Sequence, residues 1–154
     1  MRDVPTAVDR ESVTRHLGRQ PRCDFHVVAR DPSSGEPTVI ENPPFLDDGT
    51  PMPTRYWLVD PELSRRIGTL EAAGGVKEAE RTVGAEALRI THRRYEIDRD
   101  ALIDPGRTGP RPSGGVGGTR VGVKCLHTHY AWFLAGGDDP VGAWVHERLT
   151  RPEP

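Results

Sequence analysis

The segment from about Val123 to Ala135 constrains the fold most, because it is the most apolar helix that the sequence predicts. At about 100° per residue, one broad face of this helix carries Val123, Leu126, His127, Tyr130, Phe133 and Leu134. A second face carries Cys125, His129 and Trp132. Apolar groups thus cover most of the circumference, which is typical of a helix that is packed on several sides. We expect this helix to lie at the centre of the domain.

Three earlier segments are predicted to be strands. They cover residues 25–30, 37–41 and 55–59, and all three are rich in β-branched or aromatic residues. Turn-forming residues at 31–35 separate the first two, so a hairpin is the simplest arrangement.

Helices are predicted on either side of these strands. Asp9 can cap a first short helix that ends at Gly18, and Asp60 can cap a helix whose first position is a proline. A charged helical stretch covers about 78–102, where Gly84 offers a point of interruption, and a short last helix starts at Asp139. The fold class expected is α+β, with a small antiparallel sheet of about three strands packed against four to five helices.

The length favours a single domain over residues 1–154. Residues 104–119 contain six glycines and three prolines and are predicted to be a long loop, of the kind that is often functional or disordered. Residues 151–154 are predicted to be a flexible tail.

Charge and hydropathy exclude several classes of function. The net charge of −2 lacks the basic excess of a nucleic-acid binder. The sequence contains no run of about 18 apolar residues, so no membrane span is expected, and its N-terminus has no signal-like apolar core. Two cysteines are too few for a disulfide framework and are interpreted as reduced thiols. A cytoplasmic location is therefore expected.

The triplet Cys125-Leu126-His127, just after the glycine-rich run 113–118, is the strongest candidate site. A thiolate and an imidazole at this spacing suit a metal ligand pair, an activated nucleophile or an anion site. Inside a regular helix the two side chains would point about 160° apart, so they can share one ion only if Cys125 lies at or before the helix cap. His129 is one turn from Cys125 and competes for it. A buried, inert Cys125 and a partly exposed, inert His129 are the structural alternatives.

Two further interpretations of this segment remain open. A thiol at a helix start can be activated by the helix dipole, with His127 or His92 as the base. Alternatively, the glycine run with Arg111, Arg120 and Lys124 could bind an anion, although it matches neither common phosphate-binding motif.

Several sequence blocks resemble the actinobacterial domain-of-unknown-function 501 family. The resemblance rests on residues 37–39, 48–54, 56–58, 66–71, Tyr95 with 99–101, and 123–127. It covers nearly the whole chain, but it implies no activity, since the family has no established function.

The resemblance also implies a ligand set. In the family pattern, a cysteine commonly stands at the position of Asp31, and a cysteine or histidine at the position of Asp60. Together with Cys125 and His127, they would make a four-ligand site of the sort that structural zinc favours. In this chain both positions are aspartate, which mixes hard and soft ligands and favours either a catalytic metal or none. A turn role for Asp31, a cap role for Asp60 and a substitute ligand in Cys23 are the alternatives.

The leading hypothesis is therefore a small metal-binding protein in which Asp31, Asp60, Cys125 and His127 hold zinc, with metal-assisted hydrolysis of a small-molecule substrate as the reaction class. His92 is the candidate general base or outer-shell residue, and Cys125 the candidate nucleophile if the protein is a thiol enzyme. The alternative is a non-enzymatic module that has a structural Cys/His cluster and binds a protein partner through its proline-rich loops and the arginine-rich helix 86–100.

Overall fold

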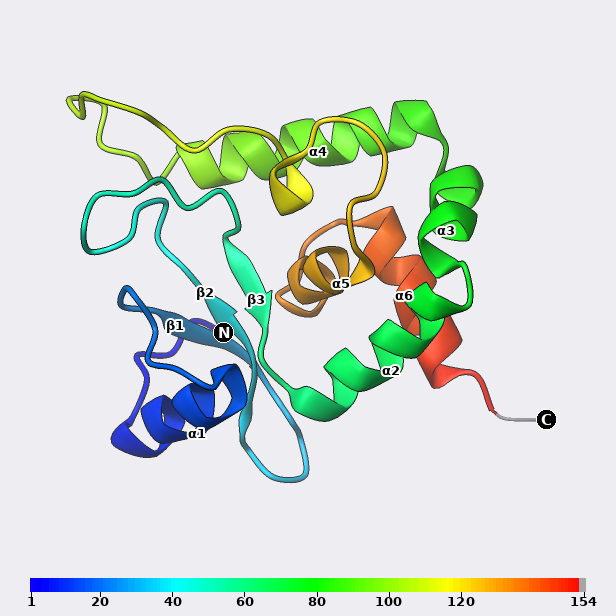
Figure 1. The fold of residues 1–154 in the computed structure, drawn as a ribbon, viewed down its shortest axis with the longest axis horizontal. Coiled ribbons are helices and arrows are strands. Elements are labelled where there is room, and N and C mark those ends of the chain that lie inside the picture. The colour runs from blue at the N-terminus through cyan, green and yellow to red at the C-terminus, as the bar shows by residue number, and fades with distance from the viewer. Residues whose placement is uncertain (153–154) are drawn as a thin grey trace.

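The structure is a computed structural model that describes residues 1–152. Within that range the chain forms six α-helices, three strands and one short 3-10 turn (Figure 1). In chain order they are α1 (Ala7–Leu17), β1 (His26–Arg30), β2 (Pro37–Glu41), β3 (Tyr56–Leu58), α2 (Pro61–Ala72), α3 (Gly75–Val83), α4 (Ala85–Asp100), η1 (Val116–Gly118), α5 (Leu126–Leu134) and α6 (Pro140–Thr150). The predicted α+β class is confirmed.

The sheet is antiparallel, with β2 between β1 and β3. Ile40 of β2 pairs with Val27 on one side and with Trp57 on the other. Every residue of β2 is buried, because both faces of the sheet are covered. One face packs with α1 in a cluster of Val13, Phe25, Val27, Ile40 and Val59. The other face packs with α4, η1 and α5 in a cluster of Val28, Val39, Tyr56, Tyr95, Val116, Ala131 and Trp132.

Helix α5 lies at the centre of the molecule, between the sheet and the helices α2, α3 and α6 (Figure 1). It buries Leu126, His129, Tyr130, Ala131 and Trp132. The expected central position is therefore confirmed, and the burial of His129 shows that the partly exposed alternative was wrong for that residue. The helix begins at Leu126 and not at Val123, because Cys125 has an extended backbone (φ −151°, ψ 154°).

The other helices begin and end largely where local signals predict. Asp60 caps α2, its Oδ1 accepting a hydrogen bond from the Leu63 N–H at 3.0 Å. The charged stretch 78–102 is divided into α3 and α4 at Gly84, whose φ of +88° favours glycine. For α1 the cap is Thr6, not Asp9 as expected. Asp9 is instead the third helical residue, and its carboxylate accepts a hydrogen bond from the Thr6 N–H, which completes a capping box.

The long glycine- and proline-rich loop is fastened to α4 rather than free. Arg99 is fully buried and donates hydrogen bonds to the carbonyls of Pro53 and Gly114. The N–H of Val116 donates to His92 Nδ1 at 3.0 Å. The N–H groups of Gly115 and Gly118 bond within the loop, so they are not turned out as an anion cradle.

The chain after α6 is only partly described. Arg151 and Pro152 follow the helix without regular structure, and residues 153–154 of the predicted tail lie outside the described residues. None of the helices within residues 1–152 has the length and apolar character needed to cross a bilayer.

Candidate functional site

Cys125 occupies the N-cap position of α5, which is the one placement that lets its side chain and that of His127 converge. Its thiol makes no capping hydrogen bond to the helix, since sulfur is a weak acceptor. The sulfur instead lies 3.3 Å from the hydroxyl oxygen of Thr128. The condition derived from helical geometry is therefore met, and Cys125 is half-buried rather than sealed in the core.

Glu71, near the C-terminal end of α2, supplies the acceptor that Cys125 does not. Its Oε2 accepts a hydrogen bond from the Leu126 N–H at 2.8 Å, at the start of α5. Its Oε1 lies 3.3 Å from Nδ1 of His127. One carboxylate thus satisfies a helix N-terminus and faces the imidazole with its second oxygen. Sequence reasoning missed this residue, although it ends one of the family-like blocks.

His127 is oriented by a backbone contact on its opposite edge. Its Nε2 lies 3.0 Å from the carbonyl oxygen of Ser64 in α2, so this nitrogen must carry a proton and donate it. Nδ1 then faces Cys125 and Glu71 either as a second N–H or as a lone pair. Among residues 1–152, Glu71, Cys125 and His127 form the one group whose potential metal-ligand atoms all lie within 4.8 Å of one another.

The charges within this Glu71–Cys125–His127 group are strongly coupled. Burial opposes ionisation of the thiol, but hydrogen bonds from His127 and Thr128 outweigh it and lower the pKa of Cys125 below its ordinary value. Conversely, the contact with Cys125 raises the pKa of His127 to about 9, against the effect of burial, with help from the Ser64 carbonyl and Glu71. Without a metal, the group therefore favours a thiolate beside an imidazolium.

A small pocket of about 260 Å³ opens beside this group. His127 and Thr128 form one wall, and the others come from Leu17, Arg19, Tyr56, Trp57 and Leu58. The guanidinium of Arg19 lies over the Trp57 ring, 5.6 Å from its centroid. A bound molecule in this pocket would contact the exposed edge of His127.

Asp31 and Asp60 lie outside the group, so the structure gathers only two of the four residues in the predicted ligand set. They line one surface depression together, between the β1–β2 turn and the start of α2. The exposed carboxylate of Asp31 accepts hydrogen bonds from Ser33 and Ser34, the Ser33 hydroxyl most of all, which lowers its pKa. Asp60 caps α2. Asp31 thus stabilises the β1–β2 turn and Asp60 caps α2, as their positions in the sequence suggest.

His92 also lies apart from the group, and both of its ring nitrogens are occupied. Nε2 lies 2.7 Å from the carbonyl oxygen of Gly122, to which it donates, and Nδ1 accepts from the Val116 N–H. Burial lowers the pKa of His92 and favours this neutral form. The ring therefore holds the loop against α4 and has no free nitrogen for a base.

The remaining thiol and imidazole candidates are also engaged elsewhere. Nδ1 of His129 lies 2.6 Å from Oδ2 of Asp139, and both side chains are fully buried. Cys23 is buried beside Asn42, and burial raises the pKa of its thiol. Neither residue belongs to the Glu71–Cys125–His127 group.

The fold and this group together define a small α+β domain with a Glu/Cys/His cluster at the start of its central helix. The family described as "Protein of unknown function (DUF501)" matches residues 28–147, most of the chain. The protein therefore belongs to the DUF501 family, and the resemblance inferred from its sequence blocks is confirmed. No curated protein and no solved structure matches the chain.

Proposed function

We propose that the protein is a metal-binding protein in which Glu71, Cys125 and His127 hold a divalent cation of the zinc type. The convergence of one carboxylate oxygen, one sulfur and one imidazole nitrogen carries this proposal. Zinc bonds of about 2.0–2.3 Å separate the donors of a tetrahedral site by roughly 3.3–3.6 Å. The distance of 3.3 Å between His127 Nδ1 and Glu71 Oε1 suits that geometry.

The surroundings of the three donors support ligation as well. Nε2 of His127 donates to the Ser64 carbonyl, the outer contact that commonly orients a metal-binding imidazole and leaves its other nitrogen as the ligand. The Leu126 N–H holds the other oxygen of Glu71, and the Thr128 hydroxyl lies against the sulfur of Cys125. Each donor is thus held by a second contact.

Three protein donors favour a catalytic role over a structural one. Structural zinc sites are usually closed by four protein ligands, whereas catalytic sites keep one position open. A cation held by Glu71, Cys125 and His127 would act as a Lewis acid and would lower the pKa of a coordinated water. The pocket beside His127 would then take the substrate, and hydrolysis is the proposed reaction class.

Metal analysis of purified, zinc-loaded protein tests the first step. We expect one zinc per chain, and at least a tenfold weaker affinity in Cys125→Ser and Glu71→Gln. The glutamine keeps an oxygen for the Leu126 N–H but loses the charge. Cys23→Ser is the matched control, because Cys23 is the other thiol and lies outside the group. Substoichiometric zinc in the parent protein, or equal losses in Cys23→Ser, would refute the site.

Cobalt substitution separates a hydrolase from a structural module. An open position should let added azide change the visible spectrum of the cobalt-loaded protein. A spectrum that azide leaves unchanged would indicate four protein ligands and favour the alternative hypothesis, a non-enzymatic module that binds a protein partner.

We also propose that the protein acts in the cytoplasm, whichever of these two functions it has.

A specific observation favours a second candidate, a thiol enzyme that works without metal. The lowered pKa of Cys125 and the raised pKa of His127 describe a thiolate–imidazolium pair with Glu71 beside it. In this case zinc would bind weakly or not at all, and Cys125 of the metal-free protein would react rapidly with an alkylating agent at neutral pH.

A further inference from the structure

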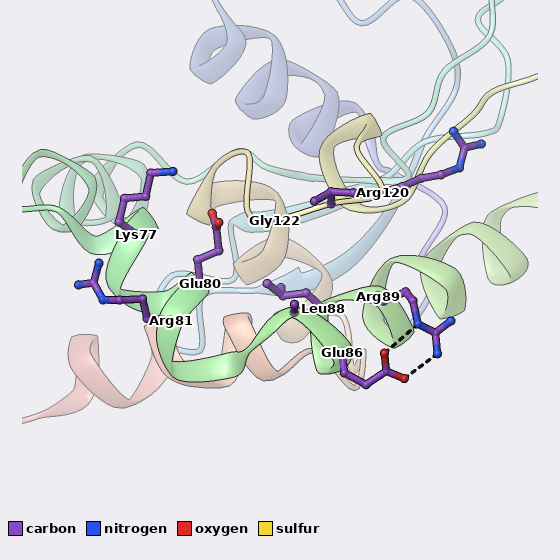
Figure 2. A pocket seen from close by; sticks show the side chains of 10 residues that line it. Lys77, Glu80, Arg81, Glu86, Leu88, Arg89, Arg120 and Gly122 are labelled. Atoms are coloured by element: carbon purple, nitrogen blue, oxygen red, sulfur yellow. Dashed lines mark hydrogen bonds and ion pairs between the residues drawn. The ribbon is translucent and has the colours of Figure 1, made fainter.

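A second cavity, of about 560 Å³, lies between α3, the start of α4 and the loop at residues 120–122 (Figure 2). Its volume is within the range of about 300–1,000 Å³ that is typical of small-molecule sites. None of Glu71, Cys125 and His127 lines it, so it is independent of the proposed metal site. Of its lining residues, only Arg120 belongs to the anion site that the sequence suggested.

The walls of this cavity are held in place before any ligand arrives. Glu80 of α3 accepts a hydrogen bond from the Val123 N–H at 3.2 Å, and His92 of α4 donates to the Gly122 carbonyl at 2.7 Å. Gly122 itself has a φ of +68°, and a side chain there would meet the Glu80 carboxylate. The loop is therefore pinned to both helices, and the buried role of His92 becomes the support of this wall.

The lining combines an apolar body with a cationic edge. Leu88, Ala85 and Val121 give apolar surface, and Val121 is 84% exposed. Figure 2 shows Lys77 and Arg81 at one end, Glu80 and Leu88 in the middle, and Arg89 at the other end. An exposed valine over a hollow with charged edges is an arrangement that a partly apolar ligand would cover.

The charges around the cavity do not balance. Four cations line it, Lys77, Arg81, Arg89 and Arg120, against the two carboxylates of Glu80 and Glu86, and Arg120 also pairs with Glu96 outside the lining, which leaves an excess of one positive charge. Both oxygens of Glu86 are held by Arg89, at 3.0 and 2.7 Å. In the part of the chain that the structure describes, Lys77 and Arg81 have no carboxylate within ion-pair distance. These two side chains, one helical turn apart, are free to meet an anion.

We propose that this cavity binds a small organic anion whose apolar body lies against Leu88, Ala85 and Val121 and whose acidic head group meets Lys77 and Arg81. Two adjacent cations suit a phosphate monoester best, because a phosphate offers several charged oxygens. The apolar surface excludes a simple inorganic ion as the natural occupant, since such an ion would leave it uncovered.

Titration of the full chain with the fluorescent anion 8-anilinonaphthalene-1-sulfonate tests this proposal. We expect saturable binding to one site per chain. The double variant Lys77→Gln/Arg81→Gln should weaken it at least tenfold through lost charge, and Ala85→Leu should weaken it by filling the cavity with no change in charge. Arg15→Gln, on the distant helix α1, is the control and should bind as the parent does. Unchanged affinity in either test variant would overturn the proposal.

Competition then identifies the head group. A medium-chain alkyl phosphate should displace the dye from the parent protein, and the corresponding alcohol should not. Equal displacement by both would overturn the role of Lys77 and Arg81. All substituted positions are exposed, so each variant is expected to unfold at the same temperature as the parent protein, which shows that it is folded.

Two-dimensional NMR spectra locate the bound anion. The amide signals of Val121 and Gly122 should shift on binding, and a shift confined to other regions would count against this cavity.

Discussion

Two histidines of α5 face carboxylates in the same manner but in opposite surroundings. Glu71 lies against Nδ1 of His127 with one oxygen and accepts from the first N–H group of α5 with the other. Asp139 lies against Nδ1 of His129 and accepts from the first N–H groups of α6. The distances are 3.3 Å and 2.6 Å, and the first pair is about one-third and one-quarter exposed whereas the second is fully buried.

The difference shows that the same histidine–carboxylate contact can be structural in one place and border a candidate site in another. The buried pair joins α5 to α6, and among residues 1–152 the other ring nitrogen of His129 has no partner at all. Because both side chains are fully buried, neither this nitrogen nor the carboxylate can reach a ligand from solvent. The more exposed pair borders a pocket and has a thiol beside it, because Cys125 stands where α5 begins. Exposure and the added sulfur, rather than the histidine–carboxylate contact itself, distinguish the candidate site.

Removing each carboxylate gives the largest expected difference between the two pairs. Asp139→Ala leaves a buried imidazole unpaired and α6 uncapped, so we expect a loss of about 2–4 kcal/mol in the free energy of unfolding. Glu71→Ala leaves a partly solvated imidazole and should cost about 1 kcal/mol. Urea denaturation in the presence of a chelator measures both. Equal losses would show that the two pairs are equally structural and would break the comparison.

A third helix-start carboxylate, Asp9 of α1, extends the comparison to a pair with arginine. Hydrogen bonds from Arg30, at 2.8 and 2.9 Å, lower the pKa of Asp9 to about 2 against the effect of burial. Because the folded-state pKa lies below the unfolded value, this stabilisation is present above about pH 4 and is lost as pH falls through about 2. It amounts to up to about 2 kcal/mol.

The variant Asp9→Asn checks this pH dependence. Its free energy of unfolding should lie below that of the parent at pH 6, and the difference should shrink as the pH is lowered from 4 to 2. A difference that stays constant over this range would mean that Asp9 acts as a capping residue only and that its pairing with Arg30 contributes nothing.

Local sequence signals predicted the helices and strands well, but they failed where a residue distant in sequence determines where an element begins. The start of α2 at Asp60 and Pro61 and the break at Gly84 follow from residues that are special in themselves. The apolar pattern predicts the start of α5 three residues too early, because Val123 and Lys124 are compatible with either a helix or a loop. The Val123 N–H is instead bound by Glu80 of α3, so these two residues stay outside the helix.

The candidate site shows the same division. Cys125 and His127 are two residues apart in sequence and could be predicted, whereas Glu71 stands 55 residues before Leu126 and no local pattern singles it out. One physical signal was available: a cysteine at a helix cap offers no oxygen, so α5 needed an acceptor from elsewhere. No comparable signal separates His127 from His129, because only the packing of α6 decides which one is sealed.

The smallest expected effect concerns the thiol that only the exposed pair possesses. In chelator-treated protein, Cys125 should react with iodoacetamide faster than Cys23, because hydrogen bonds to its sulfur lower its pKa whereas burial raises that of Cys23. Thr128→Val removes the hydroxyl at 3.3 Å and should slow the labelling of Cys125 at pH 7 by about two- to fivefold. Mass spectrometry of labelled peptides over time measures both rates within one sample, with Cys23 as the internal reference. Labelling of Cys125 that is no faster than that of Cys23, or that Thr128→Val leaves unchanged, would mean that the sulfur is not activated, and the exposed pair would then differ from the sealed one in exposure alone.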